Sequence, residues 1–174
     1  MNVSGDIITV PEAGFPFVIE CKKREEWTLD NVFLNNKDIK NWWAQVVGDA
    51  RETGNIPMLV FSRNRAEDYV LLPYNESFVD HLSTSLPREP RATMYVEYED
   101  EFKRPHGFNL ILTTVKTLGL ISPQNIRTMY DKEVYDWEKE SMTTNLNGEY
   151  EKELEIPEEK VDTHISDLIN KADI

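Results

Sequence analysis

The chain has 174 residues, of which 32 are acidic and 19 are basic, so its formal net charge is −13. This length suits one domain, or one domain with an appendage, and is sufficient to bury a hydrophobic core. No apolar run approaches the roughly 18–20 residues that span a bilayer, and Met1–Val10 lacks the features of a signal peptide. A single cysteine, Cys21, excludes an internal disulfide framework and favours a cytoplasmic protein.

The acidic excess argues against simple affinity for nucleic acid, because phosphates are normally bound by clustered Lys and Arg. The excess is unevenly distributed, however. Residues 1–110 hold 12 basic and 18 acidic side chains, whereas residues 111–174 hold 7 basic and 14 acidic ones. A metal ion would neutralise some carboxylates of the first part. The charge therefore weakens a DNA-binding hypothesis without excluding it.

Two strands are expected near the start of the chain. Gly5–Val10 is short and β-branched, and a turn at Pro11–Gly14 separates it from a second strand at Phe15–Lys23. Side chains alternate across a strand, so Glu20 and Lys22 share one face of the second strand with Val18. The other face is apolar, and we expect it to be buried with its residues Phe17, Ile19 and Cys21.

The segment Asp38–Glu52 is the clearest helix, because its apolar residues recur with helical spacing. Gly54 stands where a helix C-cap is expected. Two further strands follow at Pro57–Phe61 and Tyr69–Pro73, while Trp27–Asn36 has no regular pattern. The order β-β-α-β-β predicts a mixed sheet covered by a helix.

The signals weaken beyond Tyr74. Met94–Tyr98 alternates like a strand, and Phe108–Ile121 is ambiguous between strand and helix. Gln124–Glu140 and Pro157–Lys171 are predicted to be helical, and the segment between them is a predicted flexible linker. We therefore divide the chain into a core, an extension of that core, and an acidic linker with an amphipathic helix, at residues 1–75, 76–140 and 141–174.

Three polar residues in the first two strands indicate a metal site. Pairing of these strands would bring Asp6 close to Glu20, and two adjacent carboxylates repel unless a cation lies between them. An all-oxygen site with few protein ligands suits Mg²⁺ or Mn²⁺. Lys22 projects from the same face as Glu20 and reaches the same phosphate. This set supplies what phosphodiester hydrolysis requires, although a solvated strand face also explains the spacing.

The context of these residues resembles the PD-(D/E)XK nuclease superfamily, most closely phage-encoded proteins similar to Holliday junction resolvases. The similar segments, within residues 4–73, are Gly5-Asp6, the strand from Phe15 to Lys22, Trp42-Trp43-Ala44-Gln45 and Pro57–Phe61. The resemblance implies an α/β fold with a mixed β-sheet flanked by helices, in a restriction-endonuclease-like core. The acidic C-terminal part lies outside the resemblance, and its own pattern predicts a partly helical extension. The family core begins with a helix and a strand, which we expect to be absent ahead of Asp6. Either the chain is a fragment or a natural truncation, or a partner chain or the C-terminal part supplies these elements.

The resemblance also implies roles for individual residues. Asp6 and Glu20 would bind the metal, with the backbone carbonyl of Cys21 as a further ligand. Lys22 would position or activate the attacking water. Gln45 matches a helix glutamine that lies beside the active site in resolvase-like members.

Basic and aromatic residues outside this set have simpler explanations. Trp42 and Trp43 belong to the buried stripe of the helix, so core packing explains them better than base stacking. The best basic cluster consists of candidate phosphate contacts that a solvated turn explains equally well: Lys23, Arg24, Arg63 and Arg65. Lys103–Gly107 is a weaker candidate for a phosphate-contacting loop.

The leading hypothesis is a Mg²⁺-dependent DNA endonuclease of resolvase type, phage-derived and acting on branched or duplex DNA in recombination or processing. A homodimer in the host cytoplasm is expected by resemblance. Two alternatives remain open: a catalytically inactive binding protein with a nuclease fold, and an acidic DNA mimic that inhibits a DNA-binding partner.

Overall fold

One mixed sheet organises the part of the chain that the computed structural model describes, namely residues 5–7, 14–25, 37–62 and 65–143. Its six strands are β1 (Phe17–Lys23), β2 (Ile56–Ser62), β3 (Tyr69–Pro73), β4 (Ala92–Glu99), β5 (Pro105–Thr114) and β6 (Met142–Thr143). The helices are α2 (Lys37–Thr53), α3 (Glu76–Ser85), α4 (Val115–Gly119), α5 (Pro123–Met129) and α6 (Trp137–Ser141).

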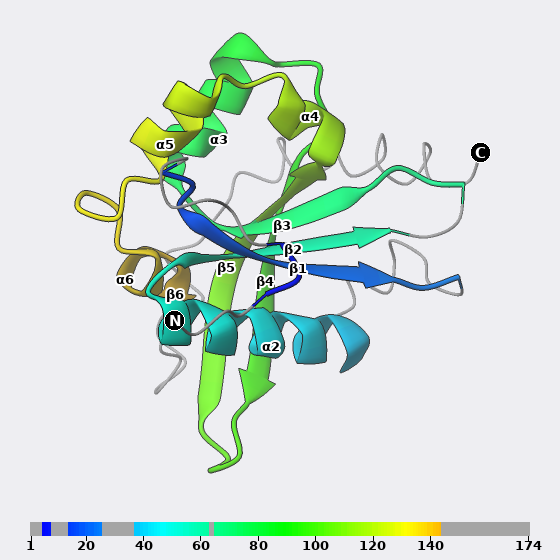
Figure 1. Cartoon of the computed structure of the whole chain (residues 1–174), viewed down its shortest axis with the longest axis vertical. Helices are drawn as coiled ribbons and strands as arrows, with labels where there is room; N and C mark the ends of the chain where they lie inside the picture. The colour runs from blue at the N-terminus through cyan, green and yellow to red at the C-terminus, as the bar shows by residue number, and fades with distance from the viewer. Residues whose placement is uncertain (1–4, 8–13, 26–36, 63–64, 144–174) are drawn as a thin grey trace.

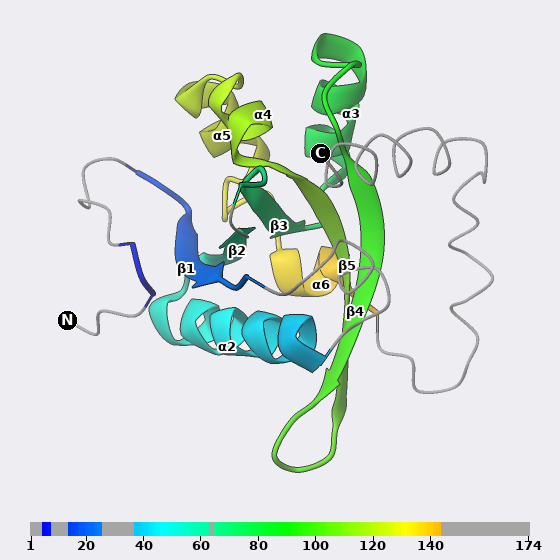
Figure 2. The same ribbon diagram turned by 90° about the vertical axis from the view of Figure 1, so that its right-hand side faces the viewer.

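The strands follow the order β1-β2-β3-β5-β4, and β6 pairs with β5 beside that path. β1 and β2 are parallel, and every other pairing among these strands is antiparallel. Parallel neighbours need a crossover connection, and α2 lies in this one. Figure 2 shows α2 on one face of the sheet and the helices α3, α4 and α5 on the other. This α/β architecture, a mixed sheet flanked by helices, confirms the predicted fold class.

Helix α2 is positioned by its apolar stripe. The six residues of this stripe are all buried against the sheet: Ile39, Trp42, Trp43, Val46, Val47 and Ala50. The helix ends before Gly54, whose φ of +70° suits glycine at a helix terminus. The predicted core role of Trp42 and Trp43 is thus confirmed, and burial of the stripe orients the polar edge of α2 toward β1.

The other face of the sheet is covered by α3 and α5. Phe78 and Leu82 of α3 are fully buried there, and Phe17 of β1 packs edge-on against Tyr130 with ring centroids 4.9 Å apart. The long antiparallel pair β4–β5 extends beyond the other strands as a hairpin (Figure 1). The strands β4 and β5 lie in the same sheet as β1. The division of the chain at residue 75 stays a prediction.

Most predicted elements are present, but one helix is not continuous. Phe108–Ile121 divides into the end of β5 and α4, which settles its ambiguity. The predicted helix over Gln124–Glu140 is wrong, because α5 ends at Met129 and α6 begins at Trp137. The carbonyl of Asp131 accepts hydrogen bonds from the N–H groups of Val134 and Tyr135, which form a turn between the two helices.

Several predictions concern residues without a description. Trp27–Asn36, Pro157–Lys171 and most of the predicted linker lie outside the described residues, although Ser141 ends α6 and Met142–Thr143 forms β6. None of the described helices has the length and apolar character that crossing a membrane requires.

Candidate active site

Asp6 lies at the free edge of β1, beside Ile19 and Cys21. The N–H of Asp6 donates a hydrogen bond of 2.8 Å to the carbonyl of Ile19, and Ile7 forms an antiparallel bridge with Ile19. Asp6 and Ile7 both face Ile19, so the pairing is locally irregular, as at a β-bulge, and it brings Asp6 to the edge of β1. The predicted pairing of the two strands is therefore present at this bridge, whereas residues 8–13 lie outside the described part.

Glu20 is buried and held by two side chains. It is only 4% exposed, in contrast to the exposed Asp6. Its Oε1 accepts hydrogen bonds from Lys22 Nζ at 2.5 Å and from Gln45 Nε2 at 2.6 Å. Lys22 Nζ also donates to Gln45 Oε1 at 3.0 Å, so the three side chains form a closed triangle. Because a buried carboxylate needs such partners, a solvated strand face does not describe Glu20.

The triangle joins two elements that are distant in sequence. Glu20 and Lys22 project from the face of β1 that α2 covers, two residues apart as alternation requires. Gln45 lies at the exposed edge of the buried stripe of α2, which positions its amide over β1. The parallel β1-α2-β2 crossover therefore assembles the cluster, and the role that the resemblance implies for Gln45 stays a prediction.

The backbone of Cys21 faces Asp6. Its N–H donates a hydrogen bond of 2.8 Å to Asp6 Oδ2. In an extended strand the N–H and C=O of one residue point toward the same edge, so the Cys21 carbonyl is also directed toward Asp6. The opposite edge of β1 pairs with β2. Asp6, Glu20 and the Cys21 carbonyl thus offer oxygen atoms around one end of β1.

The Cys21 side chain is exposed, so the prediction of a small buried hydrophobe is wrong. Phe17 and Ile19 project from the same face and are buried in the core beneath α3 and α5. Cys21 lies further along β1, which is an edge strand, and is not part of that core. Desolvation raises the pKa of the thiol above its ordinary value, and the carboxylates of Asp6 and Glu20 raise it further.

The oxygen donors suit a hard divalent cation. Two carboxylates and one carbonyl leave room for water and phosphate, which is the usual arrangement for Mg²⁺. Within the described ranges, no group of three or more His, Cys, Asp or Glu side chains comes together that would hold a metal without backbone oxygen.

Two of the predicted phosphate contacts, Lys23 and Arg24, directly follow Lys22. Lys23 and Arg24 are exposed at the end of β1, and Arg24 Nη1 forms an ion pair of 2.7 Å with Asp38 Oδ2 in the first turn of α2. The guanidinium also lies over the Trp42 ring, 5.8 Å from its centroid. Arg65 is exposed with a φ of +62°, and Arg63 lies outside the described residues.

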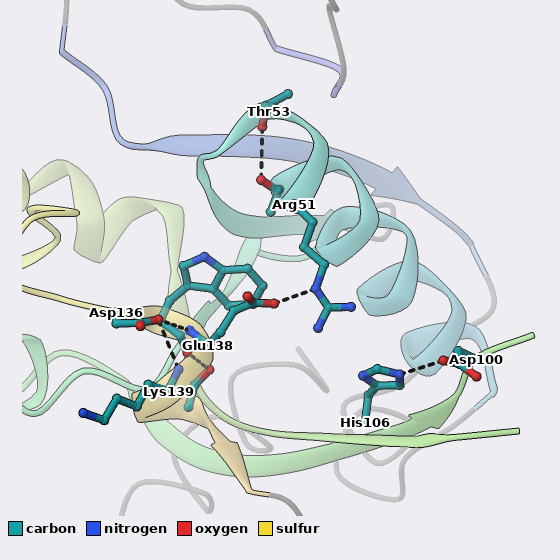
Figure 3. A network of polar contacts seen from close by, with 10 residues as sticks. Arg51, Thr53, Asp100, His106, Asp136, Glu138 and Lys139 are labelled. Carbon is teal, nitrogen blue, oxygen red and sulfur yellow. Dashed lines mark hydrogen bonds and ion pairs between the residues drawn. The ribbon is translucent and has the colours of Figure 1, made fainter. Parts of the chain in front are cut away.

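A second charged cluster, on the β4–β5 hairpin, was not predicted. Asp100 Oδ2 pairs with Arg104 Nε at 2.8 Å and with His106 Nε2 at 3.0 Å, and the second contact is drawn in Figure 3. The hydrogen bond from His106, followed by those from Arg104, holds the pKa of the Asp100 carboxyl well below its usual range. The spacing of Asp100 and Arg104 does not predict this contact, because residues four apart are neighbours on a helix and not in a hairpin turn.

Comparison with known families gives one match. A family model described as "Phage putative PDDEXK endonuclease" matches residues 1–128, which is more than half of the chain. The match includes Asp6, the Glu20 cluster and the hairpin cluster. No curated protein matches the chain, and no solved structure matches it.

Proposed function

Since this chain belongs to the family of phage PD-(D/E)XK endonucleases, we propose that it is a Mg²⁺-dependent endonuclease of Holliday junction resolvase type. The observation that carries the proposal is the buried Glu20, held by Lys22 and Gln45, on the strand whose Cys21 N–H bonds the Asp6 carboxylate. Burial of an acid costs desolvation free energy even when the acid has partners, and such groups are concentrated at functional sites.

The metal would be held by the oxygen atoms at the end of β1. Asp6, Glu20 and the Cys21 carbonyl fit Mg²⁺ or Mn²⁺, because they are hard donors and few enough to leave positions for water and phosphate. When bound, such an ion would polarise the phosphate and provide a nucleophile at neutral pH.

Lys22 and Gln45 would stabilise negative charge on the phosphate and orient the Glu20 carboxylate. The Lys22 ammonium contacts both Glu20 and Gln45, so a phosphate oxygen at the same site would lie within reach of its positive charge. We assign Lys22 the role of stabilising negative charge that develops on the phosphate and of positioning the attacking water. Gln45 donates to Glu20 Oε1 and would fix the orientation of that carboxylate.

The substrate would be DNA, branched or duplex, processed in recombination within the host cytoplasm. Resolvase-like relatives motivate a homodimer, in which two sites would cut two strands. Sedimentation of the full chain tests this part separately, because a monomer would argue against paired cleavage of a junction.

The decisive experiment uses supercoiled plasmid, a four-way junction and linear duplex, each incubated with Mg²⁺, with Mn²⁺ or with EDTA. We expect wild type to cut at least one substrate with a divalent ion and none with EDTA. The variant Glu20→Gln should be inactive, and the matched control Glu76→Gln, which alters an exposed acid in the first turn of α3, should retain activity. Equal traces from wild type and Glu20→Gln would exclude catalysis at this site.

The net charge of −13 favours a second candidate, a protein that acts by binding without cleavage. An inactive nuclease-fold protein would bind DNA or a protein, and this binding would be indifferent to Asp6→Ala. A DNA mimic would instead bind a basic partner with steep salt dependence and would not bind DNA.

A further inference from the structure

Strand β4 forms an edge of the sheet, at the end opposite β1 (Figure 2). In the part of the chain that the structure describes, β4 pairs with β5 on one side and with no strand on the other. The pairing with β5 continues without interruption from Ala92 to Glu99, so no bulge turns the outer edge away. Its eight residues form a long and regular edge, which is a template for pairing with another strand.

The alternation of the backbone determines which residues of β4 face outward. The N–H of Asp100 donates a hydrogen bond of 3.0 Å to the carbonyl of Arg104, so these two residues form a hydrogen-bonded pair of the ladder. Such pairs alternate along antiparallel strands, and even-numbered residues such as Met94 therefore direct their N–H and C=O groups toward β5. Odd-numbered residues such as Thr93 and Glu97 direct theirs toward the outer edge.

The charges along this edge are complementary to themselves. The five residues at positions 92–96 carry no charge, whereas Arg91 directly precedes them and Glu97 directly follows. Both charged side chains are partly exposed, and neither has an ion pair with another residue of the described ranges. Edge strands that avoid pairing commonly carry Lys or Pro, and this uncharged centre has neither.

An antiparallel copy of the strand brings the opposite charges together. In a two-fold pairing centred on Met94, Arg91 stands opposite Glu97 of the partner subunit, because each lies three residues from the centre. Residues that are directly opposite project from the same face, so the symmetry creates two Arg–Glu pairs. Within one chain Arg91 and Glu97 cannot meet, because six residues of extended strand separate them by about 20 Å.

We propose that the outer edge of β4 is the contact face of a homodimer, in which the β4 strands of two copies pair antiparallel and continue the sheet. This inference rests on the homodimer of the proposed function but not on cleavage. Met94 packs against the core on the α2 face and would meet Met94 of the partner subunit at the two-fold axis. The two candidate active sites would lie at opposite ends of one continuous sheet, because β1 and β4 are its two edges.

Sedimentation of the full chain over a range of concentrations tests the proposal through charge reversals. We expect wild type to dimerise, and Arg91→Glu or Glu97→Arg alone to raise the dissociation constant of the dimer about tenfold or more, because like charges then face each other. An equimolar mixture of the two variants should dimerise as wild type does, because the heterodimer restores both pairs of opposite charge. The matched control Lys116→Glu reverses an exposed charge on α4 and should dimerise like wild type.

Thr93→Pro removes an outward N–H and should also weaken the dimer, while circular dichroism should show a retained fold because proline is tolerated at this side of an edge strand. Dimers that both charge reversals leave intact would overturn the β4 face, as would a mixture that fails to recover. A monomeric wild type would overturn it too, whether another segment of the chain or another protein covers the edge. None of these outcomes bears on cleavage, which Glu20→Gln tests independently.

Discussion

Two charged clusters of this molecule look alike in chemistry and differ in how they are built. In the first, Glu20 accepts from Lys22 and Gln45, which come from β1 and α2. In the second, Asp100 accepts from Arg104 and His106, both on the same hairpin. The side chain of Glu20 is 5% exposed, whereas the side chains of Asp100 and Arg104 are 18% and 67% exposed.

The hairpin cluster has a sufficient structural explanation. Asp100 Oδ1 also accepts from the backbone N–H groups of Phe102 and Arg104, so this carboxylate organises the turn. Lys103 adopts a φ of +61° in that turn, a conformation that few residues adopt without local support. A cluster of residues close in sequence therefore stabilises its own loop, and the weaker phosphate-contact hypothesis for Lys103–Gly107 is not needed to explain it.

Sequence distance alone does not identify a functional cluster. Arg51 of α2 forms an ion pair of 2.5 Å with Glu138 of α6 (Figure 3), but both side chains are partly exposed, at 37% and 43%. This pair connects two elements at the surface, where such pairs contribute little stability. Of these three ion-paired clusters in the described part of the chain, the Glu20 cluster alone combines long-range assembly with burial. The predictions below test whether that combination distinguishes function from support.

The largest effect is expected at Lys22. In Lys22→Gln the ammonium is lost, so negative charge that develops on the phosphate is no longer stabilised, and cleavage should fall by about 10²–10³-fold. Lys116→Gln, which alters an exposed lysine of α4, is the matched control and should retain cleavage within a few-fold. Rates are compared under single-turnover conditions. A loss of less than tenfold in Lys22→Gln would remove Lys22 from the chemistry.

A smaller loss is expected at Gln45, which positions Glu20 but offers no charge. Gln45→Ala should reduce cleavage by about 10–100-fold, as is typical when the residue that orients a metal ligand is removed. The melting temperature should change little, because Gln45 is exposed and alanine favours helix. A metal titration of cleavage distinguishes the roles: a positioning residue should raise the Mg²⁺ concentration needed for half-maximal rate. An unchanged titration curve would argue against it.

The hairpin should respond in the opposite way. Asp100→Asn should leave cleavage within about twofold of wild type but lower stability at neutral pH, because the carboxylate holds the turn. The pKa of Asp100 is depressed in the folded state, so its contribution is present above the ordinary value of about 3.9 and is lost as pH falls below it. Thermal melts of both proteins should therefore differ most at pH 6, and the difference should narrow as the pH is lowered from about 4 toward the depressed value. A constant difference across that range would exclude the carboxylate as the cause.

The sequence was informative wherever a short periodic pattern determines structure. The stripe of α2 and the alternation of β1 predicted which residues face each other, so Glu20, Lys22 and the helix that carries Gln45 were found without coordinates. The break between Met129 and Trp137 was not predictable in this way. It depends on burial of Tyr130 and Tyr135, whose hydroxyls donate to the carbonyls of Pro73 and Tyr74 in a distant part of the chain.

The site shows the same limit. The pattern gives the face on which a side chain lies, but not how far along a strand the neighbouring helices extend. Cys21 therefore shares a face with Phe17 and Ile19 and is nevertheless exposed. The role of Asp100 was equally hidden, because its partners include backbone N–H groups of a turn whose conformation the sequence does not specify.

The smallest effect on cleavage is expected at Cys21, and an unchanged rate would show that the sulfur is not needed. Only the backbone of Cys21 faces Asp6, so Cys21→Ala should leave both cleavage and its metal dependence within about twofold of wild type. A small alkylating reagent should modify the exposed thiol of the wild-type protein. The cleavage rate of the alkylated protein is a second measure of whether the sulfur takes part. If Cys21→Ala abolished cleavage, the sulfur would be a ligand or a reacting group, and the all-oxygen site would be wrong. Retained cleavage in Cys21→Ala with loss in Asp6→Ala would leave the carbonyl and the two carboxylates as the donors at the end of β1.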